Sequence, residues 1–592
     1  MTDSPAHPLD PLTAEEIRQA AAILRRDRGV GAGWRFASIE LKEPGKAALA
    51  AGAAAGREAI VVCWDRSDGQ AYRAVLTLTG DAVTSWEHLP GQQPNMTVDE
   101  WHECDEMLRA HPALAEALAR RGITDMSLVL TDMWAYGAAL VPERYRGLRI
   151  GWSDVWYRGS PDGNPYAHHL TGLHPVVDLN AMTLLEIEDA GDFDRPEVMG
   201  EYLPELIGRP LREVAPLEIS QPAGAGFTLD GRLLSWQNWQ LRLGFNHREG
   251  LILHQVRFRD DGRLRPVAHR MSFAEMFVPY RDASPDHYRR TAFDIGEWGL
   301  GFMTTSLDLG CDCLGEISYL DAVVHDSAGE SREIRNAICV HEEDSGVLWK
   351  HVDERTGAAV RRQRRLVVSF HVTVANYEYL VYWRFYQDGN IECEVRATGI
   401  VVTSHAGAVS GAHGTVVDHD TYAPFHQHFI VARLDLDVDG PDNTVYAVSS
   451  EAAGEDPWGL GLVVRETPLR TEAEGKQDYD WSVQRAWKVV NEGARNGLGS
   501  RVGYKLVPSG TFPPLLSPSS PAFLRAEVIG HTLWVTPYRE DERWPCGDFP
   551  NLSFGTRDCR PGPRRTGRSR TPTWCSGTCS ASTTSPGRRT GR

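Results

Sequence analysis

Hydrophobic positions in the first ninety residues follow a helical spacing in one stretch and a strand-like spacing in others. Residues 14–27 place apolar side chains at helical intervals, and Thr13, with a glutamate three residues later, predicts a capping box at the start of this helix. Residues 57–65 and 70–78 alternate instead, which is typical of strands. The pattern predicts a small α+β domain over residues 1–92.

A second unit of the same kind follows. Residues 98–110 and 112–121 have helical spacing, whereas residues 148–152 and 176–187 have the character of strands. We therefore expect a second small α+β domain over residues 93–210.

Beyond about residue 216 the pattern changes to strands and turns. Segments rich in Val, Ile, Tyr, Phe and Trp follow one another without long helices between them, which disfavours a parallel α/β fold. The run Gln387-Asp388-Gly389-Asn390 between two of them predicts a hairpin. The segments are residues 239–245, 252–258, 365–374, 377–385 and 391–402. The predicted fold class is α+β and mainly β, with two small α+β domains followed by a large antiparallel β-sandwich over residues 211–553.

Composition and charge limit the function classes. The chain is 42% hydrophobic and 24% charged, and it has no apolar run long enough to cross a bilayer. Its net charge of −18 argues against a nucleic-acid or anionic-membrane partner and suits cationic ligands. Residues 1–12 lack the pattern of a signal peptide, so we expect a cytoplasmic protein.

The C-terminal segment differs from the rest of the chain. Residues 557–592 contain nine arginines and one acid, Asp558, so this tail carries +8 and the remaining chain −26. Ser, Thr, Gly and Pro fill most of its other positions, without helical or strand periodicity. Residues 554–592 are therefore predicted to form an aberrant basic tail without regular structure.

Two short motifs bring together residue types that carry chemistry. Residues 373–379 read Thr-Val-Ala-Asn-Tyr-Glu-Tyr, with Tyr377 at the centre of an aromatic strand. On its own, such a strand is more typical of packing tyrosines. His426 and His428 stand two residues apart, so on a strand both imidazoles reach the same face and can bind one metal ion with at least one further ligand. The alternative is two surface histidines in a loop.

Two further groups of residues in the sequence carry candidate chemistry. Asp294 lies in the sequence Phe-Asp-Ile-Gly-Glu, which on its own is typical of an acid in a glycine-containing turn; a carboxylate there acts as a general base only where burial raises its pKa toward neutrality. Cys311, Cys313 and Cys339 can be free buried thiols or zinc ligands. A zinc site fits this cysteine spacing poorly.

In order and spacing these motifs resemble the copper amine oxidase family. That family has the signature Thr-x-x-Asn-Tyr-(Asp/Glu)-Tyr, and here the histidine pair follows Tyr377 by about fifty residues. The resemblance covers roughly residues 7 to 553. It implies that copper and dioxygen oxidise Tyr377 to topaquinone, with Asn376 beside it, that Asp294 is the catalytic base, and that Tyr280 hydrogen-bonds a quinone oxygen.

The resemblance also implies the reaction and the assembly. A homodimer would oxidise primary amines with dioxygen to aldehyde, ammonia and hydrogen peroxide. Copper would be held by His426, His428 and a third histidine, and Cys313 would form a disulfide with Cys339. Further expectations are a second, calcium-like structural cation at Asp435 and Asp437, and no nucleic-acid or membrane partner.

Two alternatives from other function classes remain. One is a non-catalytic β-sandwich binding protein in which the tyrosines and histidines only pack; it would stay colourless with Cu(II) and air. The other is a His-x-His metal oxygenase, in which phenylhydrazine would fail to label Tyr377. Within the amine oxidase interpretation, Ala292 stands where the family often has a bulky aromatic residue, which predicts room for a wide amine.

The chain has no histidine after His531, so the third copper ligand is missing from this reading frame. Residues 580–592 can be back-translated into DNA that, read one nucleotide earlier, encodes a family-like motif Gly-x-x-His ending in Glu-Asp-Trp-Pro, with the histidine overlapping Thr583 and Thr584. We therefore expect a frameshift near Phe554. If the shift is genuine, copper binds weakly and Tyr377 stays unmodified; if it is a sequencing error, the cellular enzyme is longer and active.

Overall fold

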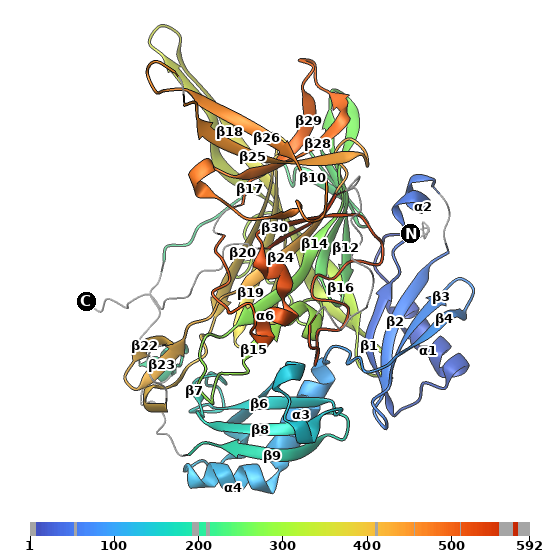
Figure 1. The fold of residues 1–592 in the computed structure, drawn as a ribbon, viewed down its shortest axis with the longest axis vertical. Helices are drawn as coiled ribbons and strands as arrows, with labels where there is room; N and C mark the ends of the chain where they lie inside the picture. Colours follow the sequence, from blue (N-terminus) through green and yellow to red (C-terminus); the bar gives the residue numbers. More distant parts are fainter. Residues whose placement is uncertain are drawn as a thin grey trace.

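The computed structural model describes residues 7–52, 56–191, 200–208, 214–408, 413–454, 456–508 and 511–555, together with the backbone of 572–577. Two small units flank a large β-sandwich (Figure 1). None of the helices in this described part of the chain combines the length and apolar character needed to span a membrane.

The first small unit packs a helix against a four-stranded antiparallel sheet of order β1-β2-β3-β4. The predicted helix is confirmed, and its capping box is present because Thr13 accepts a hydrogen bond from Glu16 N while the Glu16 carboxylate accepts one from Thr13 N. The elements are α1 (Ala14–Arg28), β1 (Trp34–Leu41), α2 (Lys46–Ala50), β2 (Glu58–Asp65), β3 (Ala71–Thr77) and β4 (Ala82–Leu89).

The second small unit has two helices on a sheet of order β5-β6-β8-β9, in which β7 also pairs with β6. The prediction of one strand over residues 176–187 is wrong, because Asp178 accepts backbone hydrogen bonds in a turn and Met182 has a φ of 52°, which ends one strand and starts the next. The elements are α3 (Val98–Ala110), α4 (Pro112–Arg120), β5 (Val129–Ala135), β6 (Ile150–Tyr157), β7 (His168–His169), β8 (Leu173–Asp178) and β9 (Thr183–Asp189).

The β-sandwich packs a ten-stranded sheet against the five-stranded sheet β16-β17-β18-β19-β20. One buried cluster joins them, with Leu243 and Phe273 from the first sheet and Ile338 and Phe370 from the second. The ten-stranded sheet contains β10 (Phe227–Asp230), β11 (Leu233–Trp236), β12 (Trp239–Asn246), β13 (Gly250–Asp260), β14 (Arg263–Pro279), β15 (Thr291–Phe293), β24 (Phe429–Leu436), β27 (Lys476–Gln477), β30 (Leu533–Pro537) and β31 (Pro572–Gly577). The fold class predicted from the sequence is confirmed.

The five-stranded sheet contains most of the strands predicted for this region. The hairpin at residues 387–390 is confirmed, since β19 and β20 pair across it. β17 and β18 extend together well beyond the sheet as a projecting arm (Figure 1). The strands are β16 (Ile317–His325), β17 (Ser331–Asp353), β18 (Gly357–Val374), β19 (Tyr377–Tyr386) and β20 (Ile391–Gly399).

Smaller elements complete the large unit. Two minor sheets have the orders β21-β23-β22 and β26-β25-β28-β29. Their strands and the short helices nearby are β21 (Ser404–His405), β22 (Gly414–Asp418), β23 (Thr421–Pro424), β25 (Asn443–Ala452), β26 (Leu462–Pro468), β28 (Ala486–Arg495), β29 (Arg501–Leu506), α5 (Pro204–Ile207) and α6 (Pro521–Arg525).

The predicted basic tail contains one regular element. Residues 572–577 form β31, which lies between β24 and β30 and pairs with both. The expectation that the whole tail lacks regular structure is therefore wrong for this segment. The reason is that a segment inserted between the edges of β24 and β30 is held by backbone hydrogen bonds to both strands. Such bonds form without any periodicity of the side chains. The rest of the tail from residue 556, including Thr583 and Thr584, lies outside the described residues.

Candidate functional site

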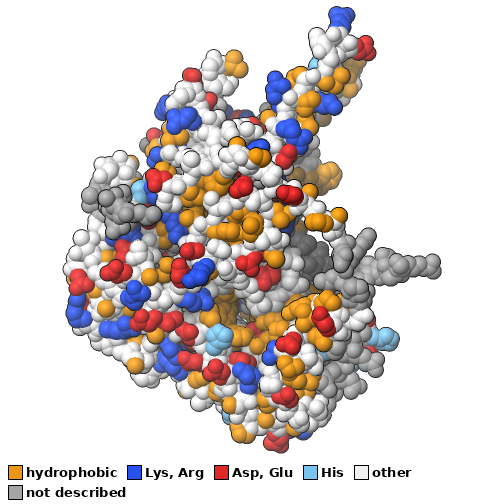
Figure 2. All heavy atoms as spheres, turned by 180° about the vertical axis from the view of Figure 1, so that it is seen from behind, with side chains coloured by type: hydrophobic (Ala, Val, Ile, Leu, Met, Phe, Trp, Pro, Cys, Tyr) orange, Lys and Arg blue, Asp and Glu red, His pale blue; other side chains and the backbone are white. Residues whose placement is uncertain are grey.

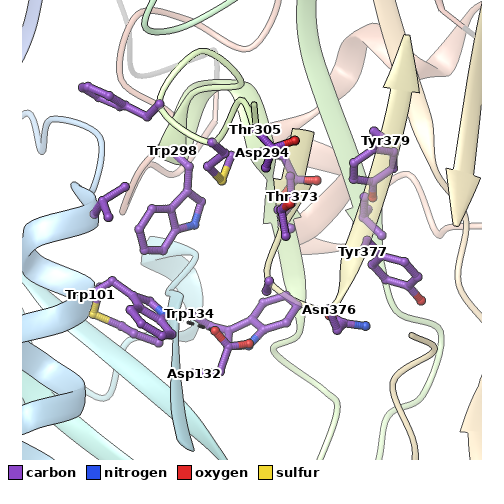
Figure 3. Close-up of a pocket in the computed structure, with 18 of the residues that line it drawn as sticks. Trp101, Asp132, Trp134, Asp294, Trp298, Thr305, Thr373, Asn376, Tyr377 and Tyr379 are labelled. Carbon is purple, nitrogen blue, oxygen red and sulfur yellow. Dashed lines mark hydrogen bonds between the residues drawn. The ribbon is translucent and has the colours of Figure 1, made fainter. Parts of the chain in front are cut away.

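A cavity of about 400 Å³ lies where the second small unit meets the β-sandwich. Figure 3 shows Trp101 and Trp134, from the second small unit, on one side of this cavity and Tyr377 and Tyr379, from β19, on the other. Most of the lining is apolar or aromatic, with carboxyl groups at a few places. Such a pocket with few polar groups is the usual form of a small-molecule site.

A tight turn positions the central tyrosine. β18 ends at Val374 and β19 begins at Tyr377, so only Ala375 and Asn376 connect the two paired strands. Ala375 has a φ of 51°, and the Asn376 side-chain amide donates a hydrogen bond to the carbonyl of Ile400. These contacts fix the hairpin end, so Tyr377 enters the cavity from a rigid strand.

The Tyr377 hydroxyl meets one of the predicted metal ligands. It lies 2.8 Å from His426 Nε2, and burial raises the pKa of Tyr377 to about 12. The Tyr280 ring stacks on the His426 ring at a centroid distance of 4.8 Å and an angle of 18°. Tyr280 and His426, nearly a hundred and fifty positions apart in the sequence, therefore stack on each other beside the Tyr377 hydroxyl.

The two histidines have the alternating arrangement that the sequence predicts. Both are buried at the start of β24, with ring centroids 4.9 Å apart, while Gln427 points away to bond Pro513 and Leu515. His426 Nδ1 faces the Pro424 carbonyl, which leaves Nε2 toward Tyr377. His428 Nδ1 bonds the Tyr379 hydroxyl at 2.9 Å.

The electrostatics of this pair suit a metal. His428 Nε2 is buried without a hydrogen-bond partner in the described part of the chain. Burial lowers the pKa of His428 to about 3 and also lowers the pKa of His426, so both rings are neutral at pH 7. Neutral imidazole is the form that binds copper. The residues present therefore fit two ligands of a copper ion, with the Tyr377 oxygen beside them, and the third histidine is missing from this reading frame.

The predicted base lines the same cavity. Asp294 begins a π-helical turn, Asp294–Trp298, directly after β15, and its side chain lines the cavity. Burial, followed by repulsion from Glu297 and Glu275, holds the pKa of Asp294 well above its ordinary value. Glu297 is itself neutralised by Arg525, so the buried acids are not equivalent. Asp294 is the one of these three acids that lines the cavity, so it is the one placed to act as a base toward a bound substrate.

Several residues of the site were not predicted. Trp101, Asp132 and Trp134 come from the second small unit, and the Trp101 indole donates a hydrogen bond to Asp132 at 3.1 Å. Glu275 and Arg525 support the turn that carries Asp294. No local motif marks these residues, since only the contact between distant segments brings them to the cavity.

Two further predictions of the sequence are not decided by the structure. Cys313 and Cys339 are both free thiols, so the predicted disulfide stays a prediction. Asp435 forms an ion pair with Lys46, while Asp435 Oδ2 and Asp437 Oδ1 have no hydrogen-bond partner among the described residues. The second, calcium-like cation likewise stays a prediction.

Comparison with known proteins identifies the family. Residues 228–560 match the model of the copper amine oxidase enzyme domain, residues 99–198 that of the copper amine oxidase N3 domain, and residues 13–86 that of the AGAO-like N2 domain. The enzyme-domain match alone spans more than half of the chain. The chain belongs to the copper amine oxidase family.

Individual copper amine oxidases resemble this chain over most of its length. A primary amine oxidase of Arthrobacter sp. (strain P1) is 41% identical over 93% of this chain and 86% of its own, and a histamine oxidase of Arthrobacter globiformis is 40% identical over 93% and 81%. The crystal structure of a copper-containing benzylamine oxidase from Hansenula polymorpha is 27% identical, with a TM-score of 0.87, and covers 97% of this chain and 94% of that one.

Family membership establishes the reaction. This copper amine oxidase is a copper-containing primary-amine oxidase, which converts primary amines with dioxygen into aldehyde, ammonia and hydrogen peroxide. The prediction of a copper amine oxidase from the sequence motifs is confirmed. The binding-protein and oxygenase alternatives receive no support from these matches.

Proposed function

We propose that Tyr377 is the precursor of the quinone cofactor and that His426 and His428 hold the copper ion. The observation that carries this proposal is the 2.8 Å contact between the Tyr377 hydroxyl and His426 Nε2, inside a cavity that Asp294 also lines. When present, copper and the quinone supply oxygen activation and an acceptor for two electrons. The protein supplies the positions and the proton transfers.

Different residues of the chain exclude water, take the substrate proton and position Tyr377. The aromatic walls formed by Trp134 and Trp298 exclude water around the amine. The Asp294 carboxylate takes a proton from the substrate carbon next to the nitrogen. Two buried acids of raised pKa line the cavity, Asp294 and Asp132, and Asp132 has the cationic Arg290 among its surroundings whereas Asp294 has none. Tyr280 stacks on His426, the hydrogen-bond partner of Tyr377, and Asn376 fixes the turn from which Tyr377 projects.

Copper binding at the histidine pair can be tested by titration. Metal-free protein that carries the third histidine is expected to bind Cu(II) and to turn pink in air, whereas the His428→Ala variant of it is expected to lose both the colour and most of the affinity, because one of the three imidazole ligands is then removed. His419→Ala, an exposed histidine on the turn before β23, is the matched control and should behave as wild type. Equal copper binding and colour in His428→Ala would contradict the proposal.

We further propose that the preferred substrates are wide primary amines. Ala292 lines the cavity with a small side chain, and the cavity volume of about 400 Å³ exceeds the needs of methylamine. Relatives are named histamine oxidase and benzylamine oxidase, after amines with a ring, and a 41% identical Arthrobacter relative is named copper methylamine oxidase. Amines such as phenylethylamine, tyramine and histamine fit these dimensions.

Substrate width is tested by narrowing the cavity at one residue. Ala292→Phe is expected to lower kcat/KM for phenylethylamine by about 10- to 100-fold, because a bulky ring in a packed pocket costs about 1–3 kcal/mol. Methylamine turnover should change little. A wild-type enzyme for which methylamine is the best substrate would overturn the assignment.

We also propose that the protein is a homodimer. Large apolar side chains are exposed on the projecting arm of β17 and β18, which stands out from the body in the surface view (Figure 2). Trp349 is 51% exposed at a position that a monomer has no reason to keep apolar. Sedimentation analysis should give a dimer, and a stable monomer at micromolar concentration would contradict this.

A further inference from the structure

Two thiols and an imidazole meet beside β17, an inner strand of the five-stranded sheet. Cys339 and His341 stand two residues apart on β17, so both side chains project from the same face. Cys313 comes from the loop before β16, where its carbonyl accepts a hydrogen bond from Gly310 N at 2.9 Å. The two sulfur atoms and one His341 ring nitrogen lie within 4.8 Å of one another. In the described ranges, this is the only group of three His, Cys, Asp or Glu side chains with such spacing.

The imidazole is oriented as a metal ligand would be. His341 Nδ1 lies 3.3 Å from Cys339 Sγ, and its other nitrogen, Nε2, lies 3.3 Å from a Glu343 carboxylate oxygen. Glu343 is fixed in turn by Arg365, whose Nε donates to it at 2.7 Å. A carboxylate on the outer ring nitrogen fixes the tautomer and leaves the inner nitrogen's lone pair toward the sulfurs.

The surroundings shield the group from solvent. Cys339 is fully buried, Cys313 and His341 are each 5% exposed, and Leu307 packs against the two thiols. Tyr319 stands opposite Cys339 in the register of β16 and β17, and its hydroxyl is buried without a hydrogen-bond partner in the described part of the chain. A buried polar atom without a partner is unfavourable, and water bound to a metal ion at this point would supply one.

We propose that Cys313, Cys339 and His341 form a second metal site that binds Zn(II) when both thiols are reduced. Two thiolates and one imidazole are ligands that zinc prefers, and water completes four-coordination. Binding displaces one proton from each thiol. The site is separate from the histidine pair at Tyr377, because its ligands lie on β17 and in the loop before β16, whereas the histidine pair lies just before β24.

The same two sulfurs can instead form the disulfide that the sequence predicts. Hydrogen peroxide, which the oxidase reaction produces, accepts two electrons from the two thiols, and the products are one S–S bond and two molecules of water. The disulfide has no thiolate to offer, so zinc is bound only by the reduced chain. The site therefore couples metal occupancy to the peroxide that the enzyme releases.

Cobalt substitution tests this site apart from the copper site. Reduced wild-type protein under argon, with its thiols counted, is expected to bind Co(II) with a sulfur-to-cobalt charge-transfer band that one equivalent of Zn(II) removes. The histidine pair has no sulfur and cannot give this band. Cys313→Ser and His341→Gln should weaken or lose the band, and Glu343→Gln should keep it with about 10- to 100-fold weaker binding.

A matched cysteine variant and treatment with hydrogen peroxide serve as controls. Cys311→Ser removes an exposed thiol two residues from Cys313 and outside the group, so its band should equal that of wild type. Hydrogen peroxide should abolish the band in wild type. The absence of a sulfur–cobalt band in folded, fully reduced wild-type protein would overturn the proposal. So would an unchanged band in both Cys313→Ser and His341→Gln, each verified as folded by circular dichroism.

Discussion

Replacing Asp294 by asparagine is expected to lower the rate of amine oxidation about 10²- to 10⁴-fold, because the substrate proton is then left without a base. The quinone should still form, since Asp294 is not among the residues in contact with the Tyr377 hydroxyl. Steady-state peroxide production and the absorbance of the cofactor measure the two effects separately. Asp388→Asn, an exposed acid in the β19–β20 hairpin, is the matched control and should leave both unchanged.

The pH dependence of kcat/KM tests the role of Asp294 a second time. Burial raises the pKa of Asp294, so its carboxyl loses the proton only at higher pH than an ordinary aspartate. Activity that needs the deprotonated base therefore falls as the pH drops through this raised pKa, and the acidic limb of kcat/KM lies above the range of an exposed carboxyl. The asparagine variant should lose this limb. Near-normal turnover with the limb intact would show that another group is the base.

Tyr377→Phe is expected to abolish the colour and the amine oxidase activity while the protein stays folded. The change removes the ring oxygen from which the cofactor is built, and it removes one hydrogen bond, to His426, at a cost of about 1 kcal/mol in the free energy of unfolding. Tyr382→Phe alters a buried tyrosine on the same strand that does not line the cavity, and it should keep colour and turnover. A coloured, active Tyr377→Phe enzyme would end the assignment.

The sequence predicts the parts of the site that are local. Asn376 and Tyr377 are neighbours in one hairpin, so residue order places them together. His426 and His428 stand two residues apart just before β24, so the strand period of two places both rings on one side. The resemblance to the family supplied Asp294, and the structure brings it to the same cavity as Tyr377.

The remainder depends on contacts between distant segments. Trp101 and Asp132 reach the cavity only because the second small unit packs on the β-sandwich, and no periodicity within either segment encodes that contact. Arg525 supports the Asp294 turn from more than two hundred residues away. The strand at residues 572–577 was missed for a related reason, since backbone pairing with β24 and β30 defines it.

The central claim, that this chain carries its quinone at Tyr377, is tested most directly by peptide mass analysis after copper loading. Metal-free protein from a gene whose C-terminal reading frame has been resequenced and encodes the third histidine is saturated with Cu(II), exposed to air, treated with phenylhydrazine and digested. We expect the label on the peptide that contains Tyr377. In a sample without phenylhydrazine, the same peptide should have gained two oxygen atoms and lost two hydrogen atoms. Copper bound at His426 and His428 with Tyr377 unmodified, or a label on any other residue, would contradict it.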